Sequence, residues 1–266
     1  MDDFEIDFPV NVVLPAGGCG ERMSINQPKQ YCEVLNRPLI VFTLYTFNRI
    51  PWIQKIVVTV SKNYVDYVKG LTQKYGYEKV TVVEGGAARH RSIYCGLKAL
   101  ENVCNQSDIV VIHDAVRIFA EEHLIKEIVM AAKLNGAAGV SRPLVSTVIA
   151  VDSEDYIEES LDRNKYRASE MPQAFRYDVI KTAYDKATDY DFDYGTECLL
   201  LAYKYTNTKA KIIVGPSNLW KVTYLKDLYA AEGMLKESLI KVQLIGCNLE
   251  MKEKLKTHIS KHRLQQ

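Results

Sequence analysis

A glycine-rich loop with two nearby cations follows the first run of apolar residues. Residues 14–23 read LPAGGCGERM, directly after the β-branched run at 10–14. Three glycines within four positions let backbone N–H groups approach an anion closely, and Arg22 and Lys29 bring positive charge to the same place. For an isolated glycine pair, a plain connecting turn is the usual alternative. Here the preceding strand and the two cations favour triphosphate binding.

The loop fits neither of the two common nucleotide-binding patterns. It lacks the Gly-Lys-Ser/Thr of a Walker A loop at the required spacing. Met23 stands where the third glycine of a dinucleotide fingerprint belongs. An NAD-dependent oxidoreductase is therefore disfavoured, and a failure to bind NAD would exclude it.

A second glycine-containing loop, EGGAARHRS at 84–92, follows the predicted strand at 79–83. In the cytidylyltransferases that the chain resembles through this loop and the motifs described below, the equivalent loop encloses cytosine. A pyrimidine of this kind needs a carbonyl to accept from its amino group and donors for its ring oxygen. The backbone of Gly85 and Gly86 and the hydroxyl of Ser92 can supply these groups. The alternative for Ser92 is a capping role, because serine is common at the start of helices.

A third loop, IHDAVR at 112–117, follows the predicted strand at 108–112. Asp114 at the end of a strand is a suitable Mg²⁺ ligand, because Mg²⁺ binds through one or two carboxylates together with phosphate oxygens. Arg117 can hold a phosphate through two hydrogen bonds. Taken alone, this motif would more often be a capped turn with a surface ion pair.

These motifs occur together in one known superfamily. The pattern LPAGGxGxRM followed by Pro28-Lys29-Gln30 resembles that of the sugar nucleotidyltransferases. Within that superfamily the chain resembles the 2-C-methyl-D-erythritol 4-phosphate and D-ribitol 5-phosphate cytidylyltransferases, from about residue 10 to residue 232. The third loop matches the family pattern HDAxRP except that Ile118 replaces the proline, and NLWKVT at 218–223 matches a closing motif.

The resemblance implies CTP as one substrate and Mg²⁺ as the divalent cation, held by Asp114. It implies Arg22, Lys29 and Lys221 as catalytic cations that neutralise the triphosphate. Ala87 stands where bacterial erythritol enzymes usually carry aspartate. The implied CTP contacts are Pro15, Ala16, Gly17, Gly18, Cys19, Gly20, Gly85, Gly86, Ala87, Ser92 and Ala115.

The segment at about 142–170 is predicted to form a β-arm inserted in the sheet domain, because β-type pieces alternate with polar turns and no helix follows promptly. In relatives this arm exchanges between two subunits, so the resemblance implies a homodimer. The implied acceptor contacts are Arg117, Thr147, Arg163 and Thr196. An ordinary hairpin with solvated arginines is the alternative.

The acceptor is inferred from three stretches that look like the animal ribitol group: RASEMPQAF, GTECLLLA and LWKVTYLKDLYAAE. Met171 stands where bacterial erythritol enzymes usually carry threonine. The resemblance therefore implies that CDP-ribitol is made from CTP and D-ribitol 5-phosphate, for transfer to a glycan of the dystroglycan type. Methylerythritol phosphate is the alternative acceptor. A non-catalytic scaffold would be expected to lose Lys29, Asp114 or Lys221, and all three are present.

The elements that must position these loops follow an α/β order. We predict a mainly parallel, Rossmann-like nucleotidyltransferase sheet of the GT-A type, whose loops bind ligands beyond the carboxyl ends of the strands. The cytidylyltransferase domain is predicted to span residues 1–240. A C-terminal extension at 241–266 is predicted to hold a short strand-like piece and a basic helical tail. Strands are predicted at 10–14, 55–60, 79–83, 108–112, 139–140 and 211–214, and helices at 38–50, 62–75, 91–101, 121–135, 177–187, 196–205 and 225–239.

The composition of the 266 residues sets the remaining limits. With 34 Lys and Arg against 33 Asp and Glu, the chain has no overall attraction to nucleic acid or to an acidic membrane. The six cysteines lack CxxC spacing, so free thiols are expected. Neither a secretory signal nor a transmembrane stretch is visible in the sequence, and the cytosol is the expected compartment. The expected partners are CTP, a polyol phosphate and a second copy of the chain.

Overall fold

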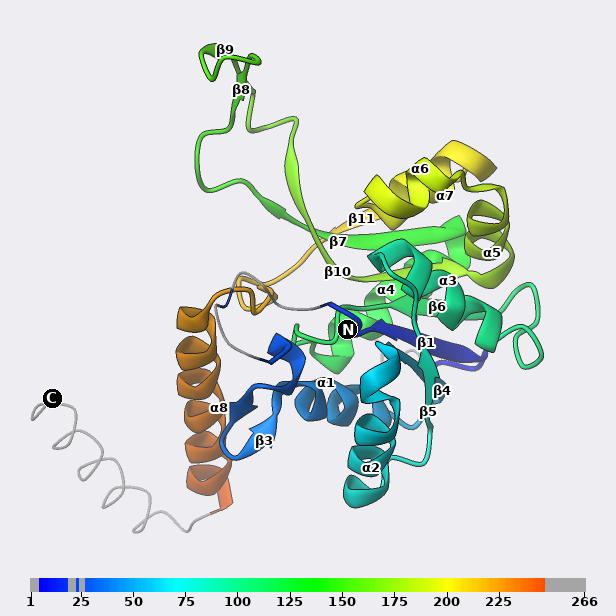
Figure 1. Ribbon diagram of the computed structural model, residues 1–266, viewed down its shortest axis with the longest axis vertical. Helices are drawn as coiled ribbons and strands as arrows, with labels where there is room; N and C mark the ends of the chain where they lie inside the picture. The colour runs from blue at the N-terminus through cyan, green and yellow to red at the C-terminus, as the bar shows by residue number, and fades with distance from the viewer. Residues whose placement is uncertain (1–4, 19–22, 24–26, 247–266) are drawn as a thin grey trace, which may run out of the picture.

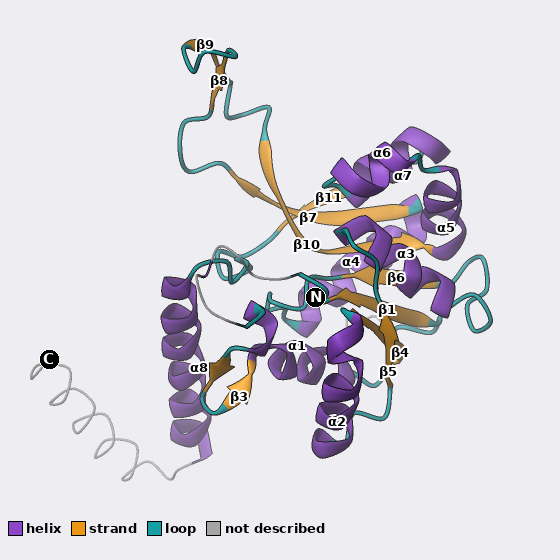
Figure 2. Ribbon diagram, in the orientation of Figure 1, coloured by secondary structure: helices purple, strands orange, loops and turns teal. Residues whose placement is uncertain are grey.

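The computed structural model describes residues 5–18, 23 and 27–246, with side chains to residue 238. Its centre is a seven-stranded sheet (Figure 1), and Figure 2 shows the strands between two layers of helices. In spatial order the strands are β11 (Lys211–Val214), β7 (Ala137–Pro143), β10 (Arg167–Arg176), β6 (Ile109–Ile112), β1 (Val10–Pro15), β4 (Ile53–Val60) and β5 (Val80–Glu84).

The sheet is mainly parallel, as predicted. Strand β1 pairs parallel with β4 and β6, β4 with β5, and β11 with β7. Strand β10 runs antiparallel to both of its neighbours, β6 and β7. The carboxyl ends of β1, β4, β5 and β6 therefore meet at one edge of the sheet, where the three predicted ligand loops begin.

Both faces of the sheet are covered. Alternate residues of β1 enter different cores: Val12 and Leu14 pack in one, and Val13 packs in the other. This double burial explains why β1 is apolar apart from Asn11, whose buried amide donates to Cys104 Sγ at 3.2 Å. The first face carries α1 (Leu39–Asn48), α2 (Val65–Tyr75) and α4 (Glu122–Asn135), and the second carries α3 (Arg89–Ala99), α5 (Tyr177–Lys186) and α7 (Cys198–Thr206).

The inserted arm is also confirmed. Strands β7 and β10 continue beyond the sheet and carry a small hairpin of β8 (Ile149–Val151) and β9 (Ile157–Ser160). In Figure 1 this hairpin stands well away from the body of the molecule. Every residue of β9 is exposed, so the arm has no core of its own in a single chain.

Several elements differ from the prediction. The sequence did not indicate the hairpin of β2 (Glu33–Val34) and β3 (Arg37–Pro38), the strand β10, or α6 (Asp189–Tyr194). The strand-like piece expected after residue 240 is wrong, because α8 (Leu225–Gly246) continues through residues 241–246. Continued helical hydrogen bonding outweighs the weak helix propensity of single β-branched residues there. The predicted tail at 247–266 lies outside the described residues.

The structure also bears on the cysteines and on membrane spans. The four cysteines within the described residues, Cys32, Cys95, Cys104 and Cys198, are free. No helix among those residues has both the length and the apolar character needed to cross a membrane.

Candidate active site

The three predicted loops meet around a single pocket of about 440 Å³ at the carboxyl ends of β1, β5 and β6. Most of the residues assigned to CTP and catalysis line it. The lining residues are Pro15, Ala16, Gly17, Gly18, Lys29, Gln30, Gly86, Ala87, Ala88, Arg89, Ser92, Asp114, Ala115, Val116, Lys221 and Thr223.

The glycine-rich loop is held by side chains that bind its carbonyl groups. Gln30 donates its amide N–H groups to the carbonyls of Ala16 (2.7 Å) and Gly18 (2.9 Å), and the Ser61 hydroxyl donates to Gly17 O (3.0 Å). In a trans peptide the N–H points opposite to the C=O. The amides of Gly17 and Gly18 therefore face away from Gln30 and Ser61, as donors for an anion.

The second loop closes tightly on α3. Ser92 lies inside the first turn of this helix, which begins at Arg89, so the alternative of a capping role does not hold. Its hydroxyl donates to Gly86 O at 3.0 Å. A Cβ on Gly86 would lie 2.4 Å from the Cβ of Arg91, so only glycine fits without a shift of the backbone. The loop thereby presents a fixed backbone edge to the pocket.

Asp114 is the centre of a cluster of charges. Its Oδ1 accepts from Arg89, and its Oδ2 lies 2.9 Å from Lys221 Nζ and 3.4 Å from Arg117 Nε. Its side chain is only 8% exposed. Burial alone would raise the pKa of Asp114, but Arg89, Lys221 and Arg117 together hold that pKa well below its usual range. Asp114 is therefore a carboxylate at neutral pH.

Two hydrogen bonds hold the loop that carries Asp114. His113 is fully buried, and its Nε2 contacts Arg117 O at 2.7 Å. Burial lowers the pKa of His113 to about 4, so the imidazole is neutral and donates from Nε2. The hydroxyl of Thr43 on α1 donates to the carbonyl of Ala115 at 2.8 Å. The first contact closes the loop on itself and the second ties it to a helix of the core, so both hold the loop in place at the pocket.

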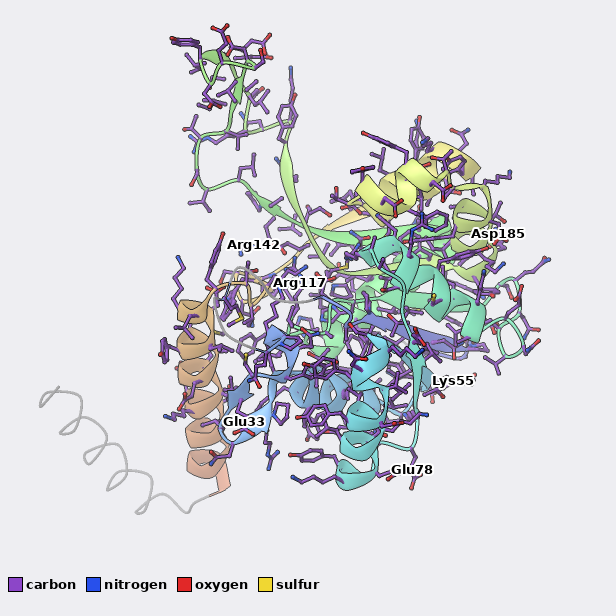
Figure 3. The ribbon with its side chains drawn as sticks, viewed as in Figure 1. Glu33, Lys55, Glu78, Arg117, Arg142 and Asp185 are labelled. Atoms are coloured by element: carbon purple, nitrogen blue, oxygen red, sulfur yellow. The ribbon has the colours of Figure 1, made fainter. Side chains whose placement is uncertain are left out.

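Arg117 links three segments beside the pocket. In addition to Asp114 it contacts the carboxylate of Glu170 on β10 and the carbonyl of Leu219, two residues before Lys221. Its side chain is 11% exposed, and it is not among the pocket-lining residues. Figure 3 shows Arg117 and Arg142 near the junction between the body and the base of the arm.

The two lysines that line the pocket come from different segments of the chain. Lys29 begins a short 3₁₀ helix (Lys29–Tyr31) and is buried. Lys221 comes from the loop before α8, which is anchored where Val222 N–H donates to Val116 O at 3.1 Å. Beneath both loops lies a small apolar core, here called the loop cluster, composed of Met23, Cys32, Val34, Leu39, Val116, Ile118, Val222, Leu228 and Ala231.

Some predicted site residues lie elsewhere or outside the described part of the chain. Gly85 supports the loop from behind, since its N–H donates to Val60 O at 2.8 Å. Thr147 and Arg163 are exposed on the arm, and Thr196 is exposed before α7; none of the three lines the pocket. Cys19, Gly20 and Arg22 lie outside the described residues.

Sequence reasoning missed the pocket cation Arg89, the loop-holding role of Gln30, and the lining residues Ala88, Val116 and Thr223. Gln30 belongs to the quoted Pro-Lys-Gln motif, so its position could have indicated it. Arg89 lies in the quoted loop at 84–92, but its partners come from distant parts of the chain, so the motif alone did not assign it a role.

The pocket suits a metal ion that is bound together with nucleotide phosphates better than one held by protein side chains alone. Asp114 is the only acidic residue among the described lining residues, and the described part of the chain contains no group of three or more His, Cys, Asp and Glu side chains that could hold a metal. Mg²⁺ commonly binds one carboxylate together with nucleotide phosphates. The donor set therefore fits Mg²⁺ that arrives with a triphosphate.

The chain resembles curated and structurally known cytidylyltransferases. It is 50% identical over 274 residues to the D-ribitol-5-phosphate cytidylyltransferase of Xenopus tropicalis, covering 97% of this chain and 67% of that protein. It is 52% identical over 233 residues to the human protein of the same description, covering 86% of this chain and 52% of that one. The chain thus spans about half to two thirds of the length of these vertebrate relatives.

Bacterial proteins match over nearly their full length. The 2-C-methyl-D-erythritol 4-phosphate cytidylyltransferase of Syntrophus aciditrophicus is 35% identical over 230 residues, covering 86% of this chain and 96% of that protein. The structure of 4-diphosphocytidyl-2C-methyl-D-erythritol synthase from Anaerococcus prevotii has a TM-score of 0.72 and 28% identity, covering 85% of this chain and 96% of that one. The family model for 2-C-methyl-D-erythritol 4-phosphate cytidylyltransferase matches residues 10–237. The chain belongs to this family of cytidylyltransferases, as its loop motifs predicted.

Proposed function

We propose that the chain transfers the cytidylyl group of CTP to D-ribitol 5-phosphate, forming CDP-ribitol and pyrophosphate. The observation that carries the acceptor assignment is the higher identity to the vertebrate ribitol-phosphate enzymes than to the bacterial erythritol-phosphate enzyme. Methylerythritol phosphate is the second candidate acceptor, because the family model is that of the erythritol enzymes.

The reaction requires positioning and charge stabilisation more than proton transfer. An oxygen of the ribitol phosphate attacks the α-phosphorus of CTP, the new P–O bond forms, and the bond from the α-phosphorus to the bridging oxygen of pyrophosphate breaks. A phosphate monoester is already nucleophilic at neutral pH, so no general base is needed. The protein must align the two phosphates and stabilise the charge that develops between them.

The described residues can perform these tasks. Lys29 and Lys221 lie on the pocket wall, where they can neutralise the triphosphate, and the amides of Gly17 and Gly18 can donate to it. Arg22 is proposed for the same role, although it lies outside the described residues. Asp114 would hold Mg²⁺ together with the phosphates, and the metal would supply further neutralisation of charge. Lys221 would then exchange its contact with Asp114 for a phosphate oxygen.

Base recognition is proposed for the loop that begins α3. Gly86, Ala87 and Ser92 line the pocket, and the Gly86 carbonyl retains a lone pair beyond the one that Ser92 occupies. This carbonyl can accept from the amino group of cytosine. Uracil carries a carbonyl oxygen at that position, which would face another acceptor, so CTP should be preferred over UTP.

The acceptor side of the site is proposed to be completed by a second subunit. Thr147 and Arg163 are exposed on an arm that extends away from the body of the molecule (Figure 1), and neither lines the pocket of its own chain. This geometry suits a homodimer in which each arm serves the other pocket. Arg117, at the base of the arm, and Thr196 are proposed to contact the acceptor from the body.

A product assay tests the proposal directly. The purified chain, with Mg²⁺, is supplied with CTP, UTP, ATP or GTP and with ribitol 5-phosphate or methylerythritol phosphate, and products are identified by mass spectrometry. We expect CDP-ribitol as the main product, and a kcat/KM preference for ribitol 5-phosphate that reaches about 10⁴-fold if pocket groups pair with its hydroxyls. A preference for methylerythritol phosphate would reassign the acceptor. Equal use of UTP would refute the proposed base recognition.

A further inference from the structure

Arg89 is a cation of the pocket that no sequence motif had assigned. It is the first residue of α3, and its side chain is 26% exposed. Nε and Nη2 donate to the same oxygen of Asp114, Oδ1, at 3.2 and 3.1 Å. Two sulfur atoms contact the rest of the guanidinium: Cys198 Sγ lies 3.6 Å from Nη1, and Met171 Sδ lies 3.9 Å from Nη2.

Cys198 belongs to a buried row of hydrogen-bonding groups behind Arg89. Its sulfur lies 3.5 Å from the hydroxyl of Tyr184, which lies 2.6 Å from Nδ1 of His90. Burial raises the pKa of the Cys198 thiol, so the sulfur keeps its proton. In one arrangement Arg89 donates to sulfur, the thiol donates to Tyr184, and Tyr184 donates to Nδ1 of His90. The proton of the His90 ring is then on Nε2, which has no partner among the described residues. The row joins α3, α5 and α7 to the pocket wall.

The two oxygens of Asp114 therefore have different surroundings. Arg89 occupies Oδ1 with two N–H groups, while Oδ2 faces Lys221 and Arg117. The sulfur partners of Arg89 are neutral and cannot compete with Asp114 for its charge. They fix the position of the guanidinium, and its positive charge interacts with the Asp114 carboxylate.

We infer that Arg89 is a positioning residue of the cytidylyltransferase site, which holds and neutralises Asp114 in the CTP pocket, and that Cys198 and Met171 hold Arg89 in place. The inference rests on the CTP site proposed above. The rival role for Arg89 is a direct contact with the phosphates of CTP. The two roles predict different dissociation constants for CTP when Asp114 is also replaced.

A charge-balanced pair of substitutions separates the two roles. The dissociation constant of CTP is measured by calorimetry in EDTA for wild type, Arg89→Met, Asp114→Asn and the double variant. Arg89→Met removes one of the three cations that neutralise Asp114 and leaves Oδ1 without its donor. The triphosphate pocket then carries one less positive charge, and we expect CTP to bind about tenfold more weakly. The double variant restores the charge balance, so its dissociation constant should return to within about threefold of wild type. A double variant as weak as Arg89→Met would show a direct phosphate contact and overturn the inference.

Arg91 provides the matched control, because it lies on the same helix but pairs with Asp189 and Asp193 on the surface. Arg91→Met should bind CTP within about twofold of wild type. Arg89→Lys keeps the charge and loses the forked geometry, so it should fall between wild type and Arg89→Met. If Arg89→Met is not folded by circular dichroism, Arg89→Gln replaces it in the single and the double variant, with the same opposed outcomes, because glutamine also removes the charge.

The role of Cys198 has its own test. Cys198→Ala should weaken CTP binding several-fold in the wild-type background and by less than about twofold in the Arg89→Met background, because its effect passes through Arg89. The melting temperature should fall in both backgrounds. An equal loss of CTP binding in the two backgrounds would show that Cys198 acts on the fold alone. A wild-type chain that does not bind CTP would overturn the proposed function together with this inference, whereas wild-type binding that Arg89→Met leaves unchanged would overturn the inference alone.

Discussion

Gly86 shows at the scale of one residue how closely the base-reading loop is fitted to α3. A Cβ there would lie 2.4 Å from Arg91 Cβ and 3.1 Å from its backbone carbonyl carbon. The loop must move to relieve this clash with Arg91, and the Gly86 carbonyl moves with it. We predict that Gly86→Ala lowers kcat/KM for CTP by about tenfold or more. Steady-state kinetics at saturating acceptor measure this.

The control for this substitution is Gly70, in the middle of α2. A Cβ on Gly70 meets nothing within 4 Å, and the residue is exposed. Gly70→Ala should keep full activity and raise the free energy of unfolding by about 0.5–1 kcal/mol. Wild-type kinetics in Gly86→Ala would contradict the tight fit of the loop.

The residues that the sequence could identify are those that act through local motifs. Lys29, Asp114, Ser92 and Lys221 were predicted from their motifs and line one pocket. Arg89 was not predicted, because nothing in its own neighbourhood of the sequence indicates that Asp114, Met171 and Cys198 surround it. The roles of Thr147 and Arg163 stay predictions, since the partner pocket they would reach belongs to another subunit.

Among the elements, α8 has a structural connection to the pocket. Leu228 and Ala231 of this helix belong to the loop cluster, which also contains Met23, Val116 and Val222 from the loops that carry the pocket residues. The helix start is fixed where Asp227 Oδ2 accepts from the N–H groups of residues 223 and 224. Helix α8 therefore supports the loop that bears Lys221.

We predict that Leu228→Ala lowers kcat more than its loss of stability explains. The substitution removes a nearly buried side chain and should cost about 2–3 kcal/mol of unfolding free energy. Leu71 on α2 has similar exposure and lies in the main core away from the pocket. Leu71→Ala should lose similar stability yet keep its kcat at a temperature where both variants are folded. Equal kcat values for the two variants would argue against a role of α8 in placing Lys221.

The predicted elements were those with a strong local pattern. Central strands such as β6 are apolar throughout because both faces are buried, so they are visible in the sequence. Strand β10 is not, because its register with β7 shifts between Ser169 and Gln173 and interrupts the alternation. Helix α6 is only six residues long, and its capping box pairs Thr188 with Asp191 instead of the usual glutamate or glutamine.

For the molecule as a whole, two buried histidines predict how stability depends on pH. Burial lowers the pKa of both His90 and His113 to about 4, against about 6.5 in an unfolded chain. Between these values the unfolded state binds more protons, so stability falls as the pH falls from 6.5 to 4. Each histidine should cost about 3 kcal/mol across that interval. Asp114 adds to the pH dependence of stability only below about pH 4. Its lowered pKa stabilises the folded state, and this stabilisation is lost as the pH falls below the pKa of Asp114 in the unfolded chain.

Urea unfolding at pH 6.5, 5.5 and 4.5 measures this dependence. We expect the free energy of unfolding to fall by up to about 2.7 kcal/mol per pH unit in the middle of the interval, since two protons are taken up on unfolding. His90→Asn should halve this slope, whatever its effect on stability at pH 7. A curve that is flat from 6.5 to 4.5 would mean that the two histidines titrate in the folded protein as they do in the unfolded chain.

The arrangement of the proposed dimer predicts the behaviour of mixed dimers. If each arm serves the partner's pocket, a dimer of an Arg163→Ala chain and a Lys29→Ala chain has one site with both defects and one site with none. Random mixing of two nearly inactive proteins should then restore about a quarter of the wild-type sites. If each arm serves its own pocket, both sites of the mixed dimer are defective and no activity returns.

The reciprocal mixture gives the opposite result and serves as the control. A chain that carries both Arg163→Ala and Lys29→Ala is paired with wild type, and the mixed dimer is isolated through two different affinity tags. With exchanged arms, one site lacks Lys29 and the other lacks Arg163, so the isolated dimer should be nearly inactive. With arms that serve their own pockets, the wild-type chain keeps one intact site, and half of the wild-type activity per dimer should remain. Each mixed dimer contains one wild-type arm, one Arg163→Ala arm, one wild-type pocket and one Lys29→Ala pocket, and the two mixtures differ only in which arm and pocket share a chain. A difference in activity between the mixtures therefore reports which pocket each arm serves and not how stable the variants are.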